Sequence, residues 1–510
     1  MKMMEIGEGK LNTPFDLQKR SHRISAACLC LTCVLIALLL ASVLCPSRKE
    51  TAYPFEYSVA SYNPYEQQLD AFLKGQLHID FKPSDELVEL ENPYDYYERY
   101  WSGAEYLWDR ALYDGKYYSY FGIAPILTVY LPYYLVRGAL PADDLVSTVF
   151  TVMTALFFSL SVIRLCSMSK SKRIPILTVW ACAIGGLFAT QCFLIMRGEA
   201  RFYYIAVSAA MAFLSAFVWL FLSGLSIKEN KISRRIFLAL AGVAYGLCFL
   251  SRVNSALMGA FLVLPMLWFF VIKDGQSNKF SSVKDIIFDL LVLGAPVIAA
   301  MAGQMVLNYM RFDSAFEFGT TYQLTVSDIS KNKLRLTDLP YAFYHYFLQP
   351  LDFTKSFPAA ELFYQRFDNY GHFVYVDTGM GLLSIPFFWL LFVSIFTLAE
   401  KKQNLSRRIT LASIFVGALA VAWMNFCLGG VIFRYTCDIT LVMALAAIAS
   451  VMFAHDSLDP NGKGIKVLNI AVGVVVAVSL FVCLTLCFSH NVNLGEYSIR
   501  AHELIGNILR

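Results

Sequence analysis

Apolar runs of bilayer-spanning length recur along the whole chain and dominate its hydrophobic pattern. A transmembrane helix needs about 20 predominantly apolar residues, and eleven stretches approach that length. They are residues 24–44, 145–163, 174–196, 202–225, 236–250, 255–272, 290–307, 382–398, 409–426, 435–453 and 467–488. The sequence therefore predicts an all-α polytopic membrane protein with about eleven transmembrane helices.

One further apolar stretch, residues 121–140, decides on which side every later loop lies. Its prolines, tyrosines and Arg137 suit a pair of interfacial helices at the headgroup level. If it does not cross, 17 Lys and Arg residues fall in the inner loops, as the positive-inside rule requires. The short outer connections then hold only Arg197, Arg201, Arg252 and Arg434. We therefore expect the N-terminus inside and the C-terminus outside.

This topology divides the chain into seven parts. They are a cytoplasmic N-terminus (1–23), a first transmembrane helix (24–44), an extracytoplasmic loop with interfacial helices (45–144), transmembrane helices 2–7 (145–307), a second extracytoplasmic segment (308–381), transmembrane helices 8–11 (382–488) and an extracytoplasmic tail (489–510). The first helix follows a basic flank but lacks a small-residue exit, which favours an uncleaved anchor over a signal peptide. A bacterial cell membrane is the expected location.

Composition agrees with a membrane protein and excludes several classes of function. The chain is 57% hydrophobic and only 16% charged, outside the usual range of soluble domains. No basic patch interleaved with aromatic residues suggests a nucleic-acid partner. The twelve cysteines form no CxxC pair and lie mostly in apolar runs, where they behave as small hydrophobes. We therefore expect neither a disulfide framework nor a cysteine metal site.

Candidate chemistry begins in the first outer loop, whose residues 45–120 hold 13 of the 29 tyrosines. Residues 108–125, W-D-R-A-L-Y-D-G-K-Y-Y-S-Y-F-G-I-A-P, are too polar to span a membrane, and we interpret them as the lip of an active site. Upstream, Glu66 and Asp70 are four residues apart and would share a helix face. Either carboxylate could be a general base that takes a proton from an incoming hydroxyl. A solvated acidic face is the competing interpretation.

Asp109 and Asp114 flank Tyr113 within the lip. Asp114-Gly115-Lys116 has the composition of a turn. The alternative is that one or both carboxylates orient an acceptor or bind a divalent cation, since hard cations favour clustered oxygen ligands. No metal-ligand spacing decides between them, so the metal requirement stays open.

Four arginines stand at outer helix ends: Arg201, Arg252, Arg311 and Arg434. A guanidinium can hold phosphate oxygens in a bidentate manner, and a charge at this depth is costly unless it is paired or functional. Arg434 has Asp438 one turn on and Arg201 has Glu199 nearby, so a local ion pair competes with phosphate binding for both. Arg252 has no acidic neighbour in sequence and is the preferred phosphate ligand.

The second outer segment opens with residues 308–325, rich in aromatic and hydrogen-bonding side chains. Such a surface suits a sugar, although a membrane-interface aromatic belt has the same composition. The lone histidines His345 and His372 are expected to be structural.

The order of helix, acidic outer loop, Pro-containing interfacial helices and basic inner loop resembles the GT-C superfamily of integral-membrane glycosyltransferases. This superfamily includes protein O-mannosyltransferases and lipid A aminoarabinose transferases. Glu66 or Asp70 occupies the position of its proposed base, and residues 122–125, Gly-Ile-Ala-Pro, replace its His-Pro-Pro-like element. A Gly-Leu-x-x-x-x-Arg element, residues 246–252, resembles the stretch that ends near the donor phosphate. Residues 108–125, 308–319 and 433–438 look like poorly characterised bacterial members.

The resemblance implies an inverting transfer of a sugar from a polyprenyl-phosphate donor to a cell-envelope acceptor, either glycan, lipid or protein, at the outer face. Donor phosphate would lie on Arg252 with help from Arg434, Arg311 or Arg201, and Asp109 and Asp114 would shape the acceptor side. Two other classes stay open: a lipid or glycan transporter, flippase or polymerase, and a non-catalytic protein of the same layout.

Overall fold

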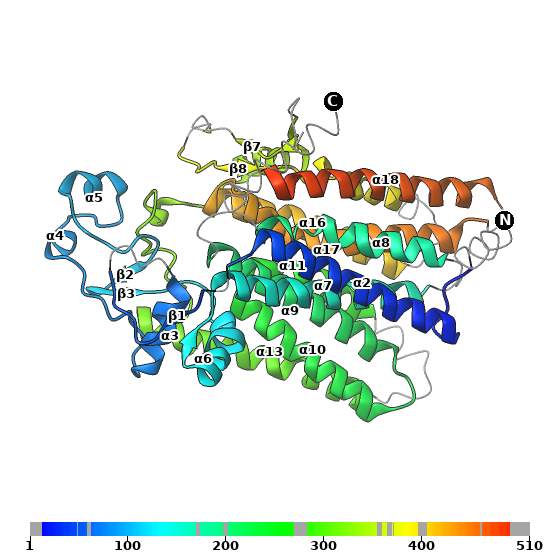
Figure 1. Cartoon of the computed structure of the whole chain (residues 1–510), viewed down its shortest axis with the longest axis horizontal. Coiled ribbons are helices and arrows are strands. Elements are labelled where there is room, and N and C mark those ends of the chain that lie inside the picture. The colour runs from blue at the N-terminus through cyan, green and yellow to red at the C-terminus, as the bar shows by residue number, and fades with distance from the viewer. Residues whose placement is uncertain are drawn as a thin grey trace.

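The computed structural model describes residues 13–47, 49–58, 63–169, 174–196, 202–269, 283–353, 360–364, 370, 372–395, 405–459 and 462–489. Arg201 and the tail from residue 490 lie outside these ranges. The long helices of the described chain are α2 (Arg20–Leu44), α7 (Asp143–Ser167), α8 (Ile176–Ala189), α9 (Phe202–Ser226), α10 (Lys231–Ser251), α11 (Val253–Phe269), α13 (Val283–Phe312), α16 (Leu405–Gly429), α17 (Phe433–Ser457) and α18 (Lys463–Ser489). They lie roughly side by side in one bundle (Figure 1).

The bundle is layered by burial. Three stretches are almost wholly enclosed by protein. They are α9, α17 and the residues Ile176–Met196, which begin with α8. Helix α9 packs between α7 and α10, and α13 packs on the outer side of α10. Helix α13 is mostly exposed and apolar, as expected for a helix that faces lipid hydrocarbon. The chain is thus an all-α polytopic membrane protein.

Nine helices of the described chain are long and apolar enough to cross a membrane, and each coincides with a predicted span. At the other two predicted positions the structure has shorter apolar helices, Val253–Trp268 and Pro386–Ile395. The second of these includes the 3-10 helix η8 (Pro386–Phe392), preceded by η7 (Leu382–Ser384). Both shorter helices end next to residues outside the described ranges.

Residues 121–140 contain no helix long enough to span. Their helical part is a π-helix, η1 (Ile126–Tyr130), continued by α6 (Leu131–Arg137). Twelve helical residues rise only about 18 Å, well short of a hydrocarbon core of about 30 Å. Gly138 then ends α6 in a left-handed conformation. The helical segment here is therefore too short to cross the membrane, which agrees with the prediction that residues 121–140 do not span it.

The charged side chains at one end of the bundle pair with each other. Arg235 contacts both Asp285 and Asp289, at 3.0 and 3.1 Å, and Arg407 contacts Asp456 at 2.6 Å. The opposite end carries the soluble segments, at the left and top of Figure 1. Arg235 and Arg407, both assigned to inner loops, thus lie at the other end of the helices from the described parts of the two outer segments. Which end faces outward remains a prediction of the positive-inside rule.

The soluble segments are built from short elements. The helices are α3 (Pro64–Leu73), α4 (Asp85–Val88), α5 (Tyr96–Ser102), η4 (Ile329–Lys331), η5 (Leu336–Asp338), α14 (Leu339–Phe343) and η6 (Tyr344–Leu348). The strands form the antiparallel pairs β1 (Thr51–Ala52) with β4 (Ala139–Leu140), β2 (Ala111–Tyr113) with β3 (Lys116–Tyr118), β5 (Asp352–Phe353) with β6 (Ala360–Glu361), and β7 (Phe363–Tyr364) with β8 (Thr378–Gly379).

A small apolar core joins the two outer segments. Ile79, Leu87, Leu107 and Tyr117 from the first segment pack with Leu324 from the second. Main-chain hydrogen bonds continue this contact, since the Leu112 N–H donates to the Tyr322 carbonyl at 2.9 Å. The first outer segment and residues 322–325 of the second therefore fold together on the end of the bundle, and we call this part the outer unit, whereas Tyr346, Val374 and Val376 of the second segment pack into the main core of the bundle.

Candidate functional site

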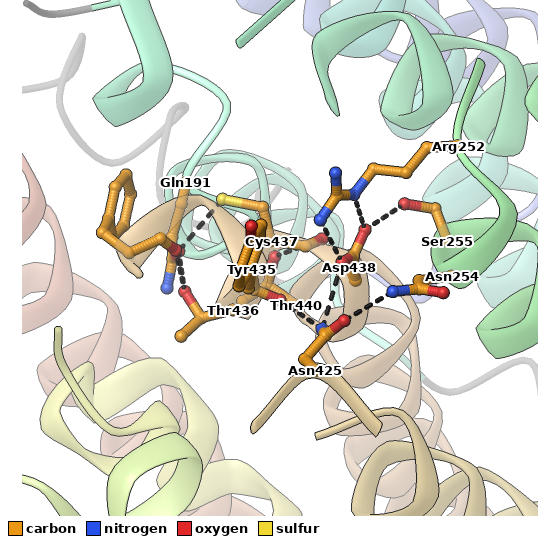
Figure 2. Close-up of polar contacts among 11 residues, drawn as sticks. Gln191, Arg252, Asn254, Ser255, Asn425, Tyr435, Thr436, Cys437, Asp438 and Thr440 are labelled. Carbon is orange, nitrogen blue, oxygen red and sulfur yellow. Dashed lines mark hydrogen bonds and ion pairs between the residues drawn. The ribbon is translucent and has the colours of Figure 1, made fainter. Parts of the chain in front are cut away.

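A buried ion pair lies where the ends of α10, α11, α16 and α17 meet, beneath the outer unit. The Nε and Nη2 atoms of Arg252 donate to the two carboxylate oxygens of Asp438 at 2.5 and 2.8 Å (Figure 2). Ser255 and Asn425 also donate to Asp438, at 2.6 and 3.1 Å. The Asp438 side chain is fully buried, so its charge depends on this set of donors. The cluster ties α10, α11, α16 and α17 together.

Local backbone geometry explains why Arg252 can reach this position. Arg252 is extended, with φ −160° and ψ 114°, and it separates α10 from α11. Its side chain therefore leaves the helix end sideways toward the first turn of α17. Sequence spacing suggested Arg434 as a partner for Asp438 and left Arg252 without one. In the structure Asp438 pairs with Arg252 instead, because the two residues are close in space although they are far apart in the sequence.

Arg434 is the unpaired cation of this region. Among the described residues, no carboxylate or other hydrogen-bonding group pairs with its guanidinium. Instead it stacks on two aromatic rings, with its Cζ atom 4.9 Å from the ring centre of Tyr203 and 5.2 Å from that of Tyr435. Arg252 stacks on Tyr435 as well, at 5.1 Å. Ring stacking orients the Arg434 guanidinium and leaves its N–H donors available to an anion.

Asp109 approaches the same cation from the outer unit. The Tyr203 hydroxyl donates to Asp109 Oδ2, so one tyrosine contacts both Asp109 and the Arg434 guanidinium. The Asp109 side chain is buried, and its Oδ1 atom has no hydrogen-bond partner among the described residues. An unsatisfied buried carboxylate oxygen is costly, which makes this atom a natural acceptor for a ligand proton.

The backbone of Asp109 is held in a conformation that needs support. Its φ is +53°, in the left-handed region that few non-glycine residues adopt. The Asp109 N–H donates to the Leu324 carbonyl at 3.0 Å, and the Leu324 N–H donates back to the Arg110 carbonyl at 2.9 Å. The second outer segment thereby clamps the position of the carboxylate. Strained, over-determined positions of this kind concentrate at functional sites.

Arg110 anchors the same stretch from the other side. Its side chain is buried, with Nε donating to Gln67 Oε1 of α3 at 2.7 Å and Nη1 to the Trp108 carbonyl at 2.9 Å. Burial lowers the pKa of Arg110 to about 10, which leaves it charged at neutral pH. Asp109 therefore projects from a rigid turn.

Gly122 docks the lip onto the ion-pair region. A Cβ atom at this position would lie 2.2 Å from the Ser251 carbonyl oxygen and 2.4 Å from that of Leu250. The main chain of the lip thus lies directly against the last turn of α10, next to Arg252. The Gly-Ile-Ala-Pro and Gly-Leu-x-x-x-x-Arg elements, distant in sequence, meet at this contact.

Asp70 occupies a closed network away from the arginines. It accepts hydrogen bonds from the Tyr53 and Tyr57 hydroxyls, at 3.0 and 2.5 Å, and forms an ion pair with Lys74 at 3.1 Å. Its side chain is buried. Both carboxylate oxygens are therefore engaged by side chains of the outer unit.

Glu66 lies on the same helix but in different surroundings. Its Oε1 accepts a hydrogen bond from the Thr51 hydroxyl at 2.8 Å. Burial raises the pKa of Glu66 to about 7, and the nearby Asp143 carboxylate adds to this effect. A carboxylate with such a pKa exchanges protons readily at neutral pH. A layer of packed rings, Tyr65 with Tyr130 and Phe121, lies between Glu66 and Tyr203.

The remaining predicted residues have separate places. Arg311 is buried, and it donates to the Ser119 carbonyl at 2.8 Å and to Asn308 at 3.1 Å, so it supports the lip. Asp114 is exposed, and with Gly115 it forms the left-handed turn between β2 and β3, as its composition predicted. The carboxylates of Asp109 and Asp114 thus differ sharply in environment. The described residues contain no group of three or more His, Cys, Asp or Glu side chains that could hold a metal ion.

Four contributors to the site escaped sequence reasoning: Tyr203, Tyr435, Asn425 and Gln191. Each lies at a helix end within an apolar or aromatic run, where it is indistinguishable from a membrane-interface residue. The only usable signal was the position of Tyr435 directly after Arg434. Gln191 also contributes, since it accepts a hydrogen bond from Thr436 at 2.9 Å and holds the start of α17 (Figure 2).

Comparison with known proteins gives structural likeness only. No protein-family model and no curated protein sequence matches the chain. Among solved structures, ArnT from Cupriavidus metallidurans bound to undecaprenyl phosphate aligns at TM-score 0.40 and 14% identity, over 87% of this chain and 63% of that one. The Archaeoglobus fulgidus oligosaccharyltransferase in the apo form aligns at TM-score 0.45 and 12% identity, over 90% of this chain and 55% of that one. The chain thus spans about 55 to 63% of the length of these structures.

Proposed function

We propose that the protein is a membrane glycosyltransferase that moves a sugar from a polyprenyl-phosphate donor to a cell-envelope acceptor at the outer face. One observation carries the proposal: Arg434, which has no hydrogen-bonding partner among the described residues, lies over the ring of Tyr203, whose hydroxyl donates to the carboxylate of Asp109. An anion-binding donor set and a proton acceptor are thereby placed together at the end of the transmembrane helices. The layout that resembles GT-C transferases points the same way.

In the proposed reaction the acceptor hydroxyl oxygen attacks the anomeric carbon of the sugar. The bond between that carbon and the phosphate oxygen breaks, and the electron pair leaves with the lipid phosphate. Arg434 binds the phosphate and stabilises the charge that develops on it, which a half-buried guanidinium does more strongly than one in water. The acceptor proton passes to a carboxylate. A single displacement of this kind inverts the anomeric centre.

Asp109 is the carboxylate that we assign as the base, because its Oδ1 has no hydrogen-bond partner among the described residues and its Oδ2 accepts from Tyr203, over whose ring Arg434 lies. This assignment revises the expectation that Asp70 or Glu66 fills the role. Asp70 positions Tyr57 and Lys74 in our proposal, since both of its oxygens already accept bonds. Glu66 is the second candidate because its raised pKa suits proton transfer. In our proposal Arg252 has a structural role through its ion pair with Asp438, and Arg311 supports the lip.

The test compares cells that carry the wild-type gene with cells that carry each variant, in a strain that lacks it. Surface glycans and lipid-linked sugars are measured by mass spectrometry. We expect Asp109→Asn to abolish the glycan product and its lipid-linked donor to accumulate, while Asp114→Asn, a carboxylate change in the same hairpin, leaves both unchanged. Glu66→Gln and Asp70→Asn locate the base by the same readout. Equal products in wild type and Asp109→Asn refute the assigned base, and unchanged glycans on loss of the gene refute the transferase.

Phosphate binding is tested separately with purified full-length protein in detergent. Undecaprenyl phosphate should raise the unfolding midpoint of the wild type, and Arg434→Gln should abolish this increase while Arg434→Lys retains part of it. Undecaprenol, which lacks the phosphate, is the matched ligand control. An equal increase in wild type and Arg434→Gln would remove Arg434 from the proposal.

A further inference from the structure

Helix α5 presents three aromatic side chains to solvent. Tyr97, Tyr100 and Trp101 are 69%, 62% and 79% exposed. In Figure 1 this helix lies at the far left of the outer unit, well away from the spanning helices. A membrane-interface belt therefore does not account for these rings. Large exposed aromatic surface on a soluble segment marks a binding surface.

The helix that carries these rings is firmly fixed. Arg99 is buried, and its guanidinium donates to the Pro93 carbonyl at 2.6 Å and to the Thr325 carbonyl. It also stacks over the Tyr106 ring at 4.8 Å. At the start of α5, Asp95 caps the helix by accepting a bond from the Tyr97 N–H at 2.8 Å. The exposed rings are thus displayed on a pre-organised support.

Ring contacts connect this surface to the candidate site. Trp101 packs on Tyr100 with 5.1 Å between ring centres, Tyr100 stacks on Tyr96 at 6.2 Å, and Tyr96 packs on Trp108 at 6.3 Å. Trp108 directly precedes Asp109 in the chain. We call Trp101, Tyr100, Tyr96 and Trp108 the aromatic track. It runs from the exposed tip of the outer unit to Trp108, the residue before the proposed base in the chain.

We infer that the aromatic track binds an oligosaccharide and that the acceptor is a growing glycan chain whose non-terminal sugars rest on these rings. This inference rests on the proposed glycosyl transfer and specifies its acceptor class. Pyranose rings carry an apolar C–H face that packs against aromatic planes, and their hydroxyl groups need acceptors at the edges. Tyrosine and tryptophan provide both an apolar face and a polar group.

The charge around the track favours a neutral or amino sugar. Helix α4, which contacts α5, and the residues around it carry the exposed carboxylates of Glu86, Glu89 and Glu91, and Glu105 follows α5; Asp85 is paired with Lys82 at 3.0 Å. Such a field repels phosphate-rich polymers and anionic lipid surfaces. The carboxylates can accept hydrogen bonds from sugar hydroxyls or amino groups. An acidic aromatic surface also attracts cationic peptides through their lysines, so a basic peptide is the alternative occupant that the experiment must separate.

The experiment uses the purified full-length protein in detergent and isothermal titration with hexasaccharides of glucose, mannose and N-acetylglucosamine. We expect at least one to bind. Trp101→Ala and Tyr100→Ala should each weaken binding on the order of tenfold, which corresponds to one good aromatic contact, and Trp101→Phe should retain most of it. Phe353→Ala, which removes an equally exposed ring elsewhere in the outer segments, is the matched control and should bind like the wild type.

Two results overturn the inference: no hexasaccharide binds, or the one that binds is unaffected by Trp101→Ala. Tighter binding of octalysine than of every hexasaccharide, lost in Trp101→Ala, assigns the surface to a cationic peptide and also overturns it. The Arg434→Gln variant keeps this experiment distinct from the test of the proposed function. Hexasaccharide binding should persist in that variant. Failure of the proposed transferase activity and failure of the oligosaccharide-binding inference can therefore be recognised independently.

Discussion

Replacing Arg252 by glutamine should destabilise the protein without affecting its binding of the polyprenyl-phosphate sugar donor. The change leaves the fully buried Asp438 carboxylate without a cation. Breaking a buried ion pair from one side costs roughly 3–5 kcal/mol. Ser255 and Asn425 still donate to Asp438, so we expect the lower end of that range, about 3 kcal/mol.

The assay is thermal unfolding of the purified full-length protein in detergent, followed by intrinsic fluorescence. At about 2 °C per kcal/mol for a large chain, the midpoint should fall by about 6 °C. Asp438→Asn alone should cost less, because the Arg252 side chain that it leaves unpaired is 18% exposed and can reach water. The double variant Arg252→Gln with Asp438→Asn should recover most of the loss, since no uncompensated charge remains. Arg434→Gln, the control, should unfold like the wild type.

An unchanged midpoint for Arg252→Gln would refute the structural role of the ion pair. A double variant as unstable as the two single losses combined would also refute it, because the cost would then lie elsewhere. If Arg252→Gln kept its stability and lost its response to undecaprenyl phosphate, Arg252 would be the phosphate ligand that sequence spacing suggested.

Two further predictions follow from packing and charge. Gly122→Ala should lower the amount of folded protein recovered from membranes, measured by size-exclusion chromatography, because the added methyl group would meet the Ser251 carbonyl at 2.2 Å. Gly303→Ala is the matched control: its added methyl group meets no atom within 4 Å, so recovery should be unchanged. Gly103→Ala would not serve as a control, because Gly103 has a positive φ. Glu66→Gln should raise the unfolding midpoint at pH 8.5 but not at pH 4.5. The unfolded chain ionises Glu66 from about pH 4.5 upward, while the folded protein keeps the proton until about pH 7. The free energy of unfolding of the wild type therefore falls by up to about 3 kcal/mol across that window. Equal midpoints of wild type and Glu66→Gln at both pH values would mean that Glu66 is freely solvated.

Much of the fold could be predicted from hydrophobic run length, because a helix in lipid must satisfy its own backbone and therefore leaves a long apolar signature. The two shorter apolar helices, Val253–Trp268 and Pro386–Ile395, mark the limit of this signal. Residues 382–398 have the composition of a span, but composition does not reveal the 3-10 geometry of η8. The turn at Asp114-Gly115 was readable because its chemistry is local.

The candidate site was predictable only as a set of residue types. Arg252 and Asp438 are 186 residues apart, and no local pattern shows that they pair. Arg434 lies one turn from Asp438, and a local ion pair between them was one of two open interpretations, yet its guanidinium lies over the rings of Tyr203 and Tyr435 instead. Asp109 showed its acidity in the sequence, but its left-handed backbone and its contact with Tyr203 depend on the second outer segment.

The clamp on Asp109 also fixes when the site can form during biosynthesis. Its main-chain partner, Leu324, is made only after helices α7 to α13 have followed the first outer segment out of the ribosome. Until then the strained turn has no hydrogen-bonded partner on that side. A nascent chain that exposes the first outer segment therefore has no assembled centre, and the site becomes complete only after α17, which carries Arg434 and Tyr435, has followed.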